Sequence, residues 1–356
     1  MMASTHEMKG DYRMFKRVSR MLLAAAVVAT GTFAAGGQAS ATTIWRFSRW
    51  VPPTHPLVTE VFVPWAKKVE QATHGDVKIQ FVSALGNPPS HFDLVKDGVA
   101  DVGMSVNSYT ANRFVLSQGM ELPFLAPNAT SACIAYWKTY EKYFAKANEY
   151  KGVHLLGIWV HGPGQIFTRE KKVDTLKDLD HLKMRVPGGV VNEIAKRLDT
   201  VPVFAPASQA YNVLSKGVAD GIFFPTESIY NFKLGPVIKQ GLEIPGGLYR
   251  LAMYIVVNQA KWDALPEKDR KAITSVSGME IAKLAGAMWD KADAGGKVGL
   301  LKLGTKFHTA SPAMMKELHG KLDSMTDEWI AKAKKKGVDG KAALDYFEAQ
   351  VKAAEK

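Results

Sequence analysis

The chain has 356 residues, of which 47% are hydrophobic and 22% are charged, as in an ordinary soluble globular protein. Its formal net charge is +12, from 46 Lys and Arg against 34 Asp and Glu. Apart from short basic runs, charges of both signs are interleaved, which argues against a nucleic-acid-binding protein with its concentrated basic stripe. The charge indicates no more than a mild preference for anionic ligands.

The N-terminal segment has the pattern of a secretory signal. Basic residues precede an apolar run at 21–33, and the small residues Ala39-Ser40-Ala41 follow it. That run is too short to span a bilayer, and the alternative, a buried N-terminal helix, has no use for small residues at alternate positions. We therefore predict a signal peptide over residues 1–41, cleaved after Ala41, and a periplasmic protein.

The remaining chain is long enough for two lobes and has little cysteine. Removing 41 of 356 residues leaves 315, enough for two lobes of roughly 150 residues each. The one cysteine, Cys133, excludes an internal disulfide, and its apolar neighbours indicate a buried side chain. No cysteine near the cleavage point could carry a lipid, so we expect a freely diffusing protein.

The segment after the signal begins an α/β lobe. Residues 44–48 alternate between apolar and polar, as a strand does, and three prolines between 52 and 56 then exclude regular structure. A helix is expected over 57–73 and a second strand over 76–82.

A nine-residue pattern occurs twice, as DLVKDGVAD at 93–101 and NVLSKGVAD at 212–220. In each copy an amphipathic helix is expected to end at a glycine, Gly98 or Gly217, that suits a left-handed C-cap, and the next residues begin a strand. Two copies so far apart indicate two lobes of similar construction, because a solenoid needs at least three close copies. Chance recurrence of a common helix cap is the alternative.

Turn motifs predict where the chain crosses between the lobes. A strand at 153–159 leads into His161-Gly-Pro-Gly164, and Pro245-Gly-Gly247 precedes a strand at 249–258. We expect an α/β protein with a hinge between its lobes. The expected division is lobe I over 42–160, lobe II over 161–248, a return to lobe I with a helix spanning both lobes over 249–290, and helices packing mainly on lobe II over 291–356.

The sequence shows no pattern typical of a catalytic or metal site. No histidine has a His or Cys partner at metal-site spacing, and phosphate-binding glycine patterns, G-x-S-x-G and H-E-x-x-H are missing. We therefore predict neither a metal nor a cofactor, and no enzyme activity.

Arg185 is the residue whose chemistry points to a ligand. It ends a strand expected at 182–186, beside the turn Pro187-Gly-Gly189. A guanidinium held on rigid backbone binds a carboxylate through two parallel hydrogen bonds, a geometry that lysine cannot match. Position alone leaves a surface salt bridge as the alternative.

Seven short stretches resemble, in collinear order over nearly all of residues 44–345, the substrate-binding subunit of tripartite ATP-independent periplasmic (TRAP) transporters. They lie at 53–56, 84–86, 93–101, 122–125, 178–187, 217–221 and 262–266. The resemblance implies a periplasmic-binding-protein fold of type II-like topology whose lobes close around an organic acid. It also implies that Arg185, in the Lys-x-Arg-Val-Pro stretch, pairs with the ligand carboxylate, and that the partners are the permease subunits of such a transporter.

Two departures from the family pattern concern the ligand. Gln165 stands where sialic-acid-type members have a second arginine, and Phe223-Phe224 stands where many members have asparagine. A buried asparagine needs polar ligand atoms, whereas phenylalanine favours apolar or aromatic surface. We therefore expect a monocarboxylate with a hydrophobic or aromatic body. The candidate ligand-binding residues are Arg185, Gln165, Phe223, Phe224, Trp50, Tyr109, Trp159 and His161, although aromatic residues at such positions also suit a core.

Two other functions remain open from the residues. A solute-binding protein of an ATP-driven importer, or a periplasmic sensor, would have the same two-lobed fold with a different membrane partner. A periplasmic enzyme would need a nucleophile, a metal or an acid–base pair in the cleft. We expect a monomer that does not bind nucleic acid.

Overall fold

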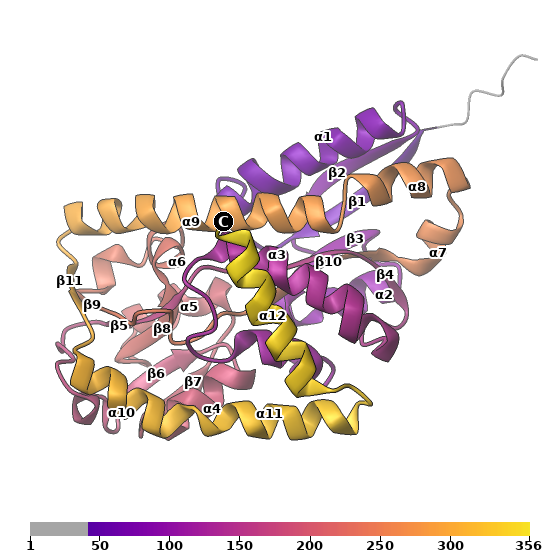
Figure 1. The fold of residues 1–356 in the computed structure, drawn as a ribbon. Coiled ribbons are helices and arrows are strands. Elements are labelled where there is room, and N and C mark those ends of the chain that lie inside the picture. Colours follow the sequence, from indigo (N-terminus) through magenta and orange to yellow (C-terminus); the bar gives the residue numbers. More distant parts are fainter. Residues whose placement is uncertain (1–41) are drawn as a thin grey trace, which may run out of the picture. The chain divides into compact units, whose positions relative to one another are not determined.

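The computed structural model describes residues 42–356, and the predicted signal peptide, residues 1–41, lies outside the described residues. Within the described part, the chain forms two α/β lobes, each built around its own sheet (Figure 1). The two-lobed α/β class predicted from the sequence is thus confirmed. None of the helices in residues 42–356 combines the length and the apolar character needed to cross a membrane.

The first lobe contains a five-stranded sheet in the order β2-β1-β3-β10-β4. The strands are β1 Thr43–Arg49, β2 Val77–Ser83, β3 Val102–Val106, β4 Val153–Val160 and β10 Ala252–Asn258. Strand β1 is parallel to β2 and β3, whereas β10 is antiparallel to β3 and β4. Strand β10 therefore comes back from the later part of the chain to complete the first sheet.

The second lobe contains a six-stranded sheet in the order β11-β9-β5-β8-β6-β7. The strands are β5 Gly164–Thr168, β6 Lys183–Val186, β7 Val201–Phe204, β8 Gly221–Pro225, β9 Gln240–Glu243 and β11 Lys306–Thr309. Strand β6 is parallel to β7 and β8, and β5 is antiparallel to β8 and β9. The series β7-β6-β8-β5-β9 thus repeats the order and directions of β2-β1-β3-β10-β4.

The repeated sequence pattern has the same backbone geometry in both lobes. Helices α2 (His91–Lys96) and α5 (Ala210–Ser215) are followed by Gly98 and Gly217, whose φ angles are +76° and +69°. Glycine adopts such a left-handed φ without the steric penalty of a side chain. The predicted glycine C-caps are confirmed, and the chain leaves them to form β3 and β8.

The aspartate that ends each copy fastens one strand to its neighbour. The backbone N–H of Arg46, in β1, donates to Asp101 Oδ2 at 2.8 Å. The N–H of Lys183, in β6, donates to Asp220 Oδ2 at 2.9 Å. The same hydrogen bond at the same place in two sheets supports a common construction for the lobes over a chance recurrence of the cap.

Helices cover the faces of both sheets. Besides α2 and α5, they are η1 Leu57–Phe62, α1 Val63–Ala72, α3 Ala129–Thr139, α4 Gly189–Arg197, α6 Thr226–Asn231, α7 Gln259–Asp263, α8 Glu267–Ser275, α9 Met279–Lys302, α10 Pro312–Leu322, α11 Ser324–Lys335 and α12 Gly340–Ala354. Short turns of helix are η2 Pro88–Ser90, η3 Asn107–Thr110, η4 Leu116–Glu121, η5 Tyr140–Phe144, η6 Ala145–Ala147, η7 Leu176–Leu179, η8 Ala207–Gln209 and η9 Gly235–Val237.

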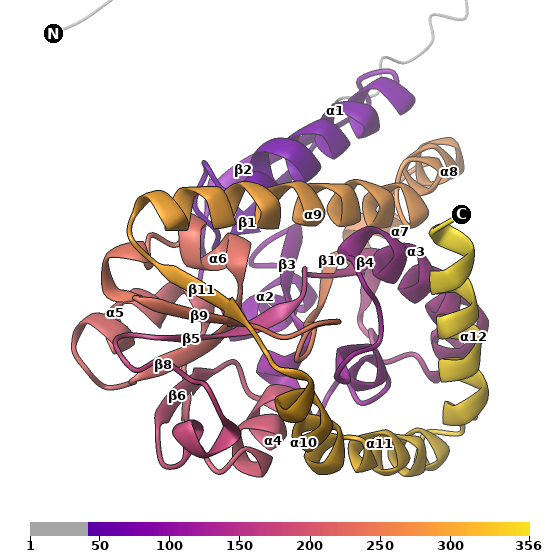
Figure 2. The ribbon, with the colours of Figure 1, turned by 60° about the vertical axis from the view of Figure 1, so that its left-hand side comes forward.

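Helix α9 runs along both lobes (Figures 1 and 2). It packs against α3 and β4 of the first lobe and against α6 of the second. A Cβ at Gly286 would lie 2.6 Å from Thr130 Cα, and one at Gly296 would lie 3.1 Å from Glu227 Cα. Two glycines thus let α9 approach the backbone of each lobe closely. Gly278, with φ +56°, separates α9 from the preceding helix α8.

The C-terminal helices differ from the prediction. Helix α10 packs against α4 of the second lobe, but α12 packs against α3 of the first. Helix α11 contacts both lobes, because Glu328 pairs with Arg197 and Trp329 Nε1 donates to the carbonyl of Val115 at 3.1 Å. The expectation that residues 291–356 pack mainly on lobe II is wrong for α12. The sequence specifies the apolar face of such a helix but not the surface that covers it.

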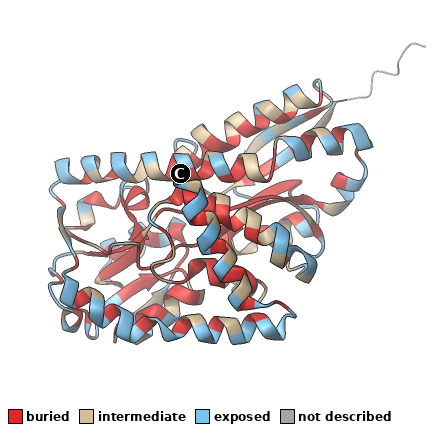
Figure 3. Ribbon diagram, in the orientation of Figure 1, coloured by how far each residue is buried: buried red, intermediate tan, exposed pale blue. Residues whose placement is uncertain are grey.

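The interior is apolar, and its single thiol is part of it. The strands are mostly buried, whereas the outer faces of α9, α10 and α11 are exposed (Figure 3). Cys133, on α3, is fully buried, as predicted, and burial raises the pKa of its thiol to about 12. The thiol is therefore neutral at physiological pH and not a nucleophile.

Candidate ligand-binding site

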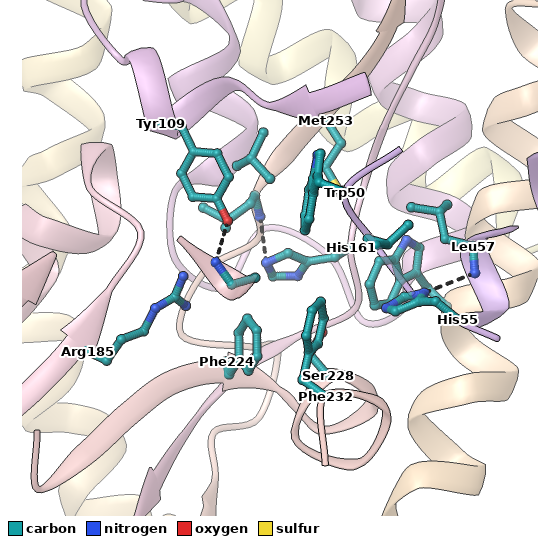
Figure 4. Close-up of a pocket in the computed structure, with 15 residues that line it drawn as sticks. Trp50, His55, Leu57, Tyr109, His161, Arg185, Phe224, Ser228, Phe232 and Met253 are labelled. Carbon is teal, nitrogen blue, oxygen red and sulfur yellow. Dashed lines mark hydrogen bonds between the residues drawn. The ribbon is translucent and has the colours of Figure 1, made fainter. Parts of the chain in front are cut away.

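A cavity lies between the two lobes, at the carboxyl ends of the parallel strands (Figure 4). Trp50 follows β1 and Tyr109 follows β3 in the first lobe, while Arg185 lies near the end of β6 and Phe224 near the end of β8 in the second. The space not occupied by protein atoms is about 390 Å³, including solvent at the mouth. Open α/β sheets bind ligands at this edge.

Arg185 is fully buried and carries unused hydrogen-bond donors. Its Nε donates to the carbonyl of Ala205 at 2.8 Å, which fixes the plane of the guanidinium. Nη1 and Nη2 are buried and make no hydrogen bond of normal geometry within residues 42–356, although the Tyr109 hydroxyl lies close enough to stabilise the cation. Burial lowers the pKa of Arg185, but an arginine side chain keeps its charge in proteins. A buried cation with two free nitrogens requires an anion with two acceptors, such as a carboxylate.

Two tyrosine hydroxyls lie near the guanidinium. Tyr109 Oη accepts the N–H of Ala207 at 2.9 Å, so its own proton remains free to donate. Tyr249 Oη is buried and has no partner within the described part of the chain. Burial raises the pKa of both tyrosines, which are therefore neutral donors. Together with Arg185 they form a site rich in donors and poor in acceptors.

Aromatic side chains form the walls of the cavity. The Arg185 guanidinium lies 4.9 Å from the centroid of the Phe224 ring, and Phe224 lies 5.8 Å from Phe232. On the side of the first lobe, Trp50 packs against Tyr109 at 6.3 Å. The Trp50 indole N–H donates to the carbonyl of Met104 at 3.0 Å, so this side chain offers the cavity an apolar surface. Such walls favour an aromatic or aliphatic ligand body.

His161 is a neutral part of the wall. Its Nε2 accepts the backbone N–H of Leu251 at 3.1 Å, and its Nδ1 therefore carries the proton and donates to the carbonyl of Gly162 at 2.5 Å. Burial, with a smaller contribution from the positive charges of Arg250 and Arg185, lowers the pKa of His161 to about 3. With both nitrogens bonded and the charge suppressed, this imidazole is neither a ligand for an anion nor an acid–base group.

At the other end of the cavity, a histidine of the first lobe meets a carboxyl group of the second. His55 Nε2 lies 3.1 Å from Glu227 Oε1, and His55 Nδ1 accepts the N–H of Leu57 at 3.2 Å. Burial lowers the pKa of His55 to about 4 and raises that of Glu227 to about 8. This contact is therefore a neutral hydrogen bond between the lobes rather than an ion pair.

Of the eight residues selected from the sequence, the structure places five on the wall of this cavity. These are Trp50, Tyr109, His161, Arg185 and Phe224. The other three lie elsewhere: Gln165 Oε1 accepts the N–H of Ile244 at 2.5 Å, and Phe223 and Trp159 are fully buried in the hydrophobic core. Adjacent residues of a strand face opposite ways, so Phe224 and Phe223 cannot both face the cavity.

The sequence did not single out several residues of the wall. His55 belongs to the Pro53-Thr-His-Pro56 stretch, which offered a signal that could have been used. Ser228, Phe232 and Trp289 come from α6, the turn after it and α9, and no local pattern distinguishes them from core residues.

The model of a protein family, described as bacterial extracellular solute-binding protein, family 7, matches residues 47–333. The chain belongs to this family. The curated relatives of this solute-binding protein include one from Comamonas testosteroni, described as outer membrane transporter protein TsaT. It is 32% identical over 303 residues, which cover 85% of this chain and 89% of the relative.

Solved structures of high similarity are TRAP solute-binding proteins, so the resemblance noted from the sequence is confirmed. One from Bordetella bronchiseptica, with bound (R)- and (S)-mandelate, has a TM-score of 0.85 and 40% identity and covers 87% of this chain and 99% of its own. One from Rhodoferax ferrireducens, with copurified benzoate, has a TM-score of 0.82 and 28% identity over 88% and 99%. A marine metagenome protein described as specific for aromatic acids has a TM-score of 0.82 and 29% identity over 88% and 100%.

Proposed function

We propose that this protein captures an aromatic or similarly hydrophobic monocarboxylate in the periplasm and delivers it to the membrane subunits of a TRAP transporter. The buried guanidinium of Arg185, with two nitrogens left without partners in residues 42–356, carries the proposal. The relatives described above bind mandelate, benzoate and other aromatic acids, which supports the same ligand class here.

In the proposed complex, the ligand carboxylate lies against Arg185 Nη1 and Nη2, and its ring lies along Phe224. The free proton of Tyr109 Oη supplies a further donor to the carboxylate. Among the residues that line the cavity, Arg185 is the one arginine and there is no lysine. A second ligand carboxylate would therefore enter a dry apolar space without a cation, which is costly. This is the physical reason to expect a monocarboxylate.

Release and capture then require the lobes to move apart. The chain crosses between the sheets at 161–163 and again at 244–251, and Gly246 and Gly247, with φ of +76° and +82°, lie on the second crossing. Short crossings with unusual backbone freedom suit a hinge, and periplasmic binding proteins close in this way. We expect a monomer whose radius of gyration decreases when ligand binds.

A catalytic role is disfavoured by the state of the two histidines at the cavity. Both ring nitrogens of His55 and of His161 are already hydrogen-bonded within the protein, and burial lowers the pKa of both. Neither can act as a general base near neutral pH without breaking these bonds. Binding without turnover is what the cavity is suited to.

The test is a calorimetric titration of the mature protein with benzoate, (R)-mandelate, succinate and a sugar acid such as gluconate. We expect the two aromatic monocarboxylates to bind and to raise the melting temperature in proportion to concentration, as mass action requires. Tighter binding of succinate or gluconate than of both aromatic acids would contradict the proposal. Nonspecific anion binding to surface histidines and lysines would give equal responses for the three monoanions and a larger one for the dianion succinate, so it can be told apart from a preference for aromatic acids.

A further inference from the structure

The cavity has two polar ends joined by an apolar middle. A row of side chains connects the two ends. The Arg185 guanidinium is 4.9 Å from the centroid of the Phe224 ring. The ring centroids of Phe224 and Phe232 are 5.8 Å apart, and those of Phe232 and His55 are 5.4 Å apart. Figure 4 shows Arg185 and His55 at opposite sides, with Phe224 and Phe232 between them. A ligand whose carboxylate contacts Arg185 therefore directs the far side of its body toward His55.

The end near His55 offers an acceptor. Ser228 lines the cavity and is buried, and its hydroxyl donates to Glu227 Oε2 at 2.7 Å. A hydroxyl oxygen has two lone pairs, so at least one lone pair of Ser228 Oγ remains available whether Ser228 or the neutral Glu227 carboxyl supplies the proton of this bond. The Glu227 carboxyl that holds Ser228 is itself bonded to His55 and to Asn231 Nδ2, at 3.1 and 3.0 Å, which fixes its position.

The same end offers a donor. Trp289 lines the cavity from α9 and is 3% exposed, and its ring centroid lies 6.2 Å from that of His55 and 5.8 Å from that of His161. Its indole Nε1 is buried and has no hydrogen-bond partner in residues 42–356. A buried N–H without a partner is unfavourable, so a ligand atom that accepts from it gains affinity.

We propose that Ser228 and Trp289 form a second recognition site, which binds a hydroxyl group on the ligand at the end remote from its carboxylate. A hydroxyl both donates and accepts, and so matches the free lone pair of Ser228 and the free N–H of Trp289. This inference rests on the proposed function, and it narrows the ligand class from aromatic acids to ring-hydroxylated aromatic acids.

The ligand itself gives the first test. Wild-type protein is titrated calorimetrically with 3- and 4-hydroxybenzoate and with the size-matched 3- and 4-methylbenzoates. We expect at least one hydroxy acid to bind about fivefold or more tightly than its methyl counterpart, since one hydrogen bond to an otherwise unpaired buried group gives a discrimination of that order. Equal affinity within both pairs would overturn the inference.

The second test uses variants of the protein. The measured quantity is the affinity for the hydroxybenzoate divided by the affinity for its methyl counterpart, in the pair that the wild type distinguishes. We expect Trp289→Phe and Ser228→Ala each to bring this ratio close to one. The matched controls are Trp45→Phe and Ser131→Ala, because Trp45 Nε1 and Ser131 Oγ are also buried without partners in the described part but do not line the cavity. The controls should keep the wild-type ratio.

Failure of this inference can be told apart from failure of the proposed function. Arg185→Ala should weaken the hydroxy and methyl acids by the same factor and leave their ratio unchanged, because it removes the carboxylate anchor alone. If no benzoate binds at all, the proposed function is wrong and the inference falls with it. If benzoates bind but the ratio survives in both Trp289→Phe and Ser228→Ala, only the inference is wrong. Melting curves of all variants establish that each is folded.

Discussion

The two fully buried arginines, Arg185 and Arg250, differ in how many of their guanidinium nitrogens are hydrogen-bonded within the protein. We relate this difference to two roles, ligand binding for Arg185 and stability for Arg250. Arg250 donates from Nη1 to the carbonyl of Gly246 at 3.1 Å and from Nη2 to that of Ala126 at 2.6 Å. The two terminal nitrogens of its guanidinium, here called the fork, thus join the second crossing to the first lobe. The fork of Arg185 is unused, and only its Nε is bonded. Burial alone does not mark a candidate binding residue. Arg185 leaves Nη1 and Nη2 without partners within residues 42–356 and lines the cavity, whereas Arg250 leaves only Nε without a partner and does not line it.

The largest expected effect follows from removing the anchor at Arg185. Losing one member of a hydrogen-bonded ion pair in a desolvated site costs roughly 2–5 kcal/mol, or about 30-fold to several thousand-fold in affinity. We expect Arg185→Ala to lower the calorimetric affinity for benzoate by such a factor. Arg185→Lys should also bind weakly, since an ammonium cannot form the two parallel bonds.

Both Arg185 variants should keep a cooperative melting transition, because no partner within residues 42–356 depends on the fork. Arg197→Ala, on the surface of the second lobe, is the control and should bind benzoate as the wild type does. Wild-type affinity in Arg185→Ala would show that the carboxylate is bound elsewhere.

The opposite result is expected at Arg250. Arg250→Met keeps much of the side-chain volume but leaves one buried and one half-buried carbonyl without their charged donor, so we expect a loss of about 3 kcal/mol in the free energy of unfolding. Urea denaturation followed by tryptophan fluorescence measures this loss. Benzoate affinity of the folded variant should fall far less than in Arg185→Ala. Unchanged stability would remove the contrast between the two arginines.

A smaller effect concerns pH and the contact between the lobes. Burial raises the pKa of Glu227 to about 8 in the folded protein, above the usual value of 4.5, so between these values the folded state holds a proton that the unfolded state has released. The free energy of unfolding must then fall as pH rises through this window. His55, whose pKa burial lowers from 6.5 to about 4, has the opposite slope below pH 6.5. Burial also raises the pKa of Glu121 to about 8 and that of Asp293 to about 7, so a comparison with a variant is needed to isolate Glu227 in the interval from pH 6.5 to 8.

Glu227→Gln, which imitates the protonated carboxyl, should lose this dependence. Relative to the wild type, we expect it to gain about 2 kcal/mol in unfolding free energy between pH 6.5 and 8, the equivalent of about 1.5 pKa units. Urea denaturation of both proteins at several pH values measures the difference. A difference that stays constant over this interval would show that Glu227 ionises in the folded state as it does in water.

The smallest effect is expected on the outer face of α9. A Cβ at Gly295 would meet no atom within 4 Å, so Gly295→Ala should stabilise the helix by about 0.5–1 kcal/mol. The matched variant Gly286→Ala places a Cβ 2.6 Å from Thr130 Cα and should instead destabilise by about 1–3 kcal/mol. Denaturation midpoints distinguish them. Equal effects would mean that the close approach of α9 to the first lobe contributes nothing.

Local patterns predicted much of the fold because each of them is decided within a few residues. A glycine that takes φ of +76° or +69° after an amphipathic helix ends that helix in any surroundings, and apolar runs such as 153–159 form strands because they bury both faces. The position of Arg185 at the cavity could be predicted for the same reason, since a strand end beside a Pro-Gly-Gly turn places a side chain at the edge of a sheet.

Only the tertiary structure decided which side chains reach the cavity. Strand register determines that Phe224 and not Phe223 faces the cavity, and the pairing of β5 with β9 directs Gln165 to the backbone of Ile244. The far end of the cavity combines His55, Ser228 and Trp289 from three distant segments. Helix α12 packs against α3 of the first lobe and not, as the sequence had predicted, on the second lobe. Such contacts depend on how whole elements pack, and packing is set by surfaces that no single segment of the sequence contains.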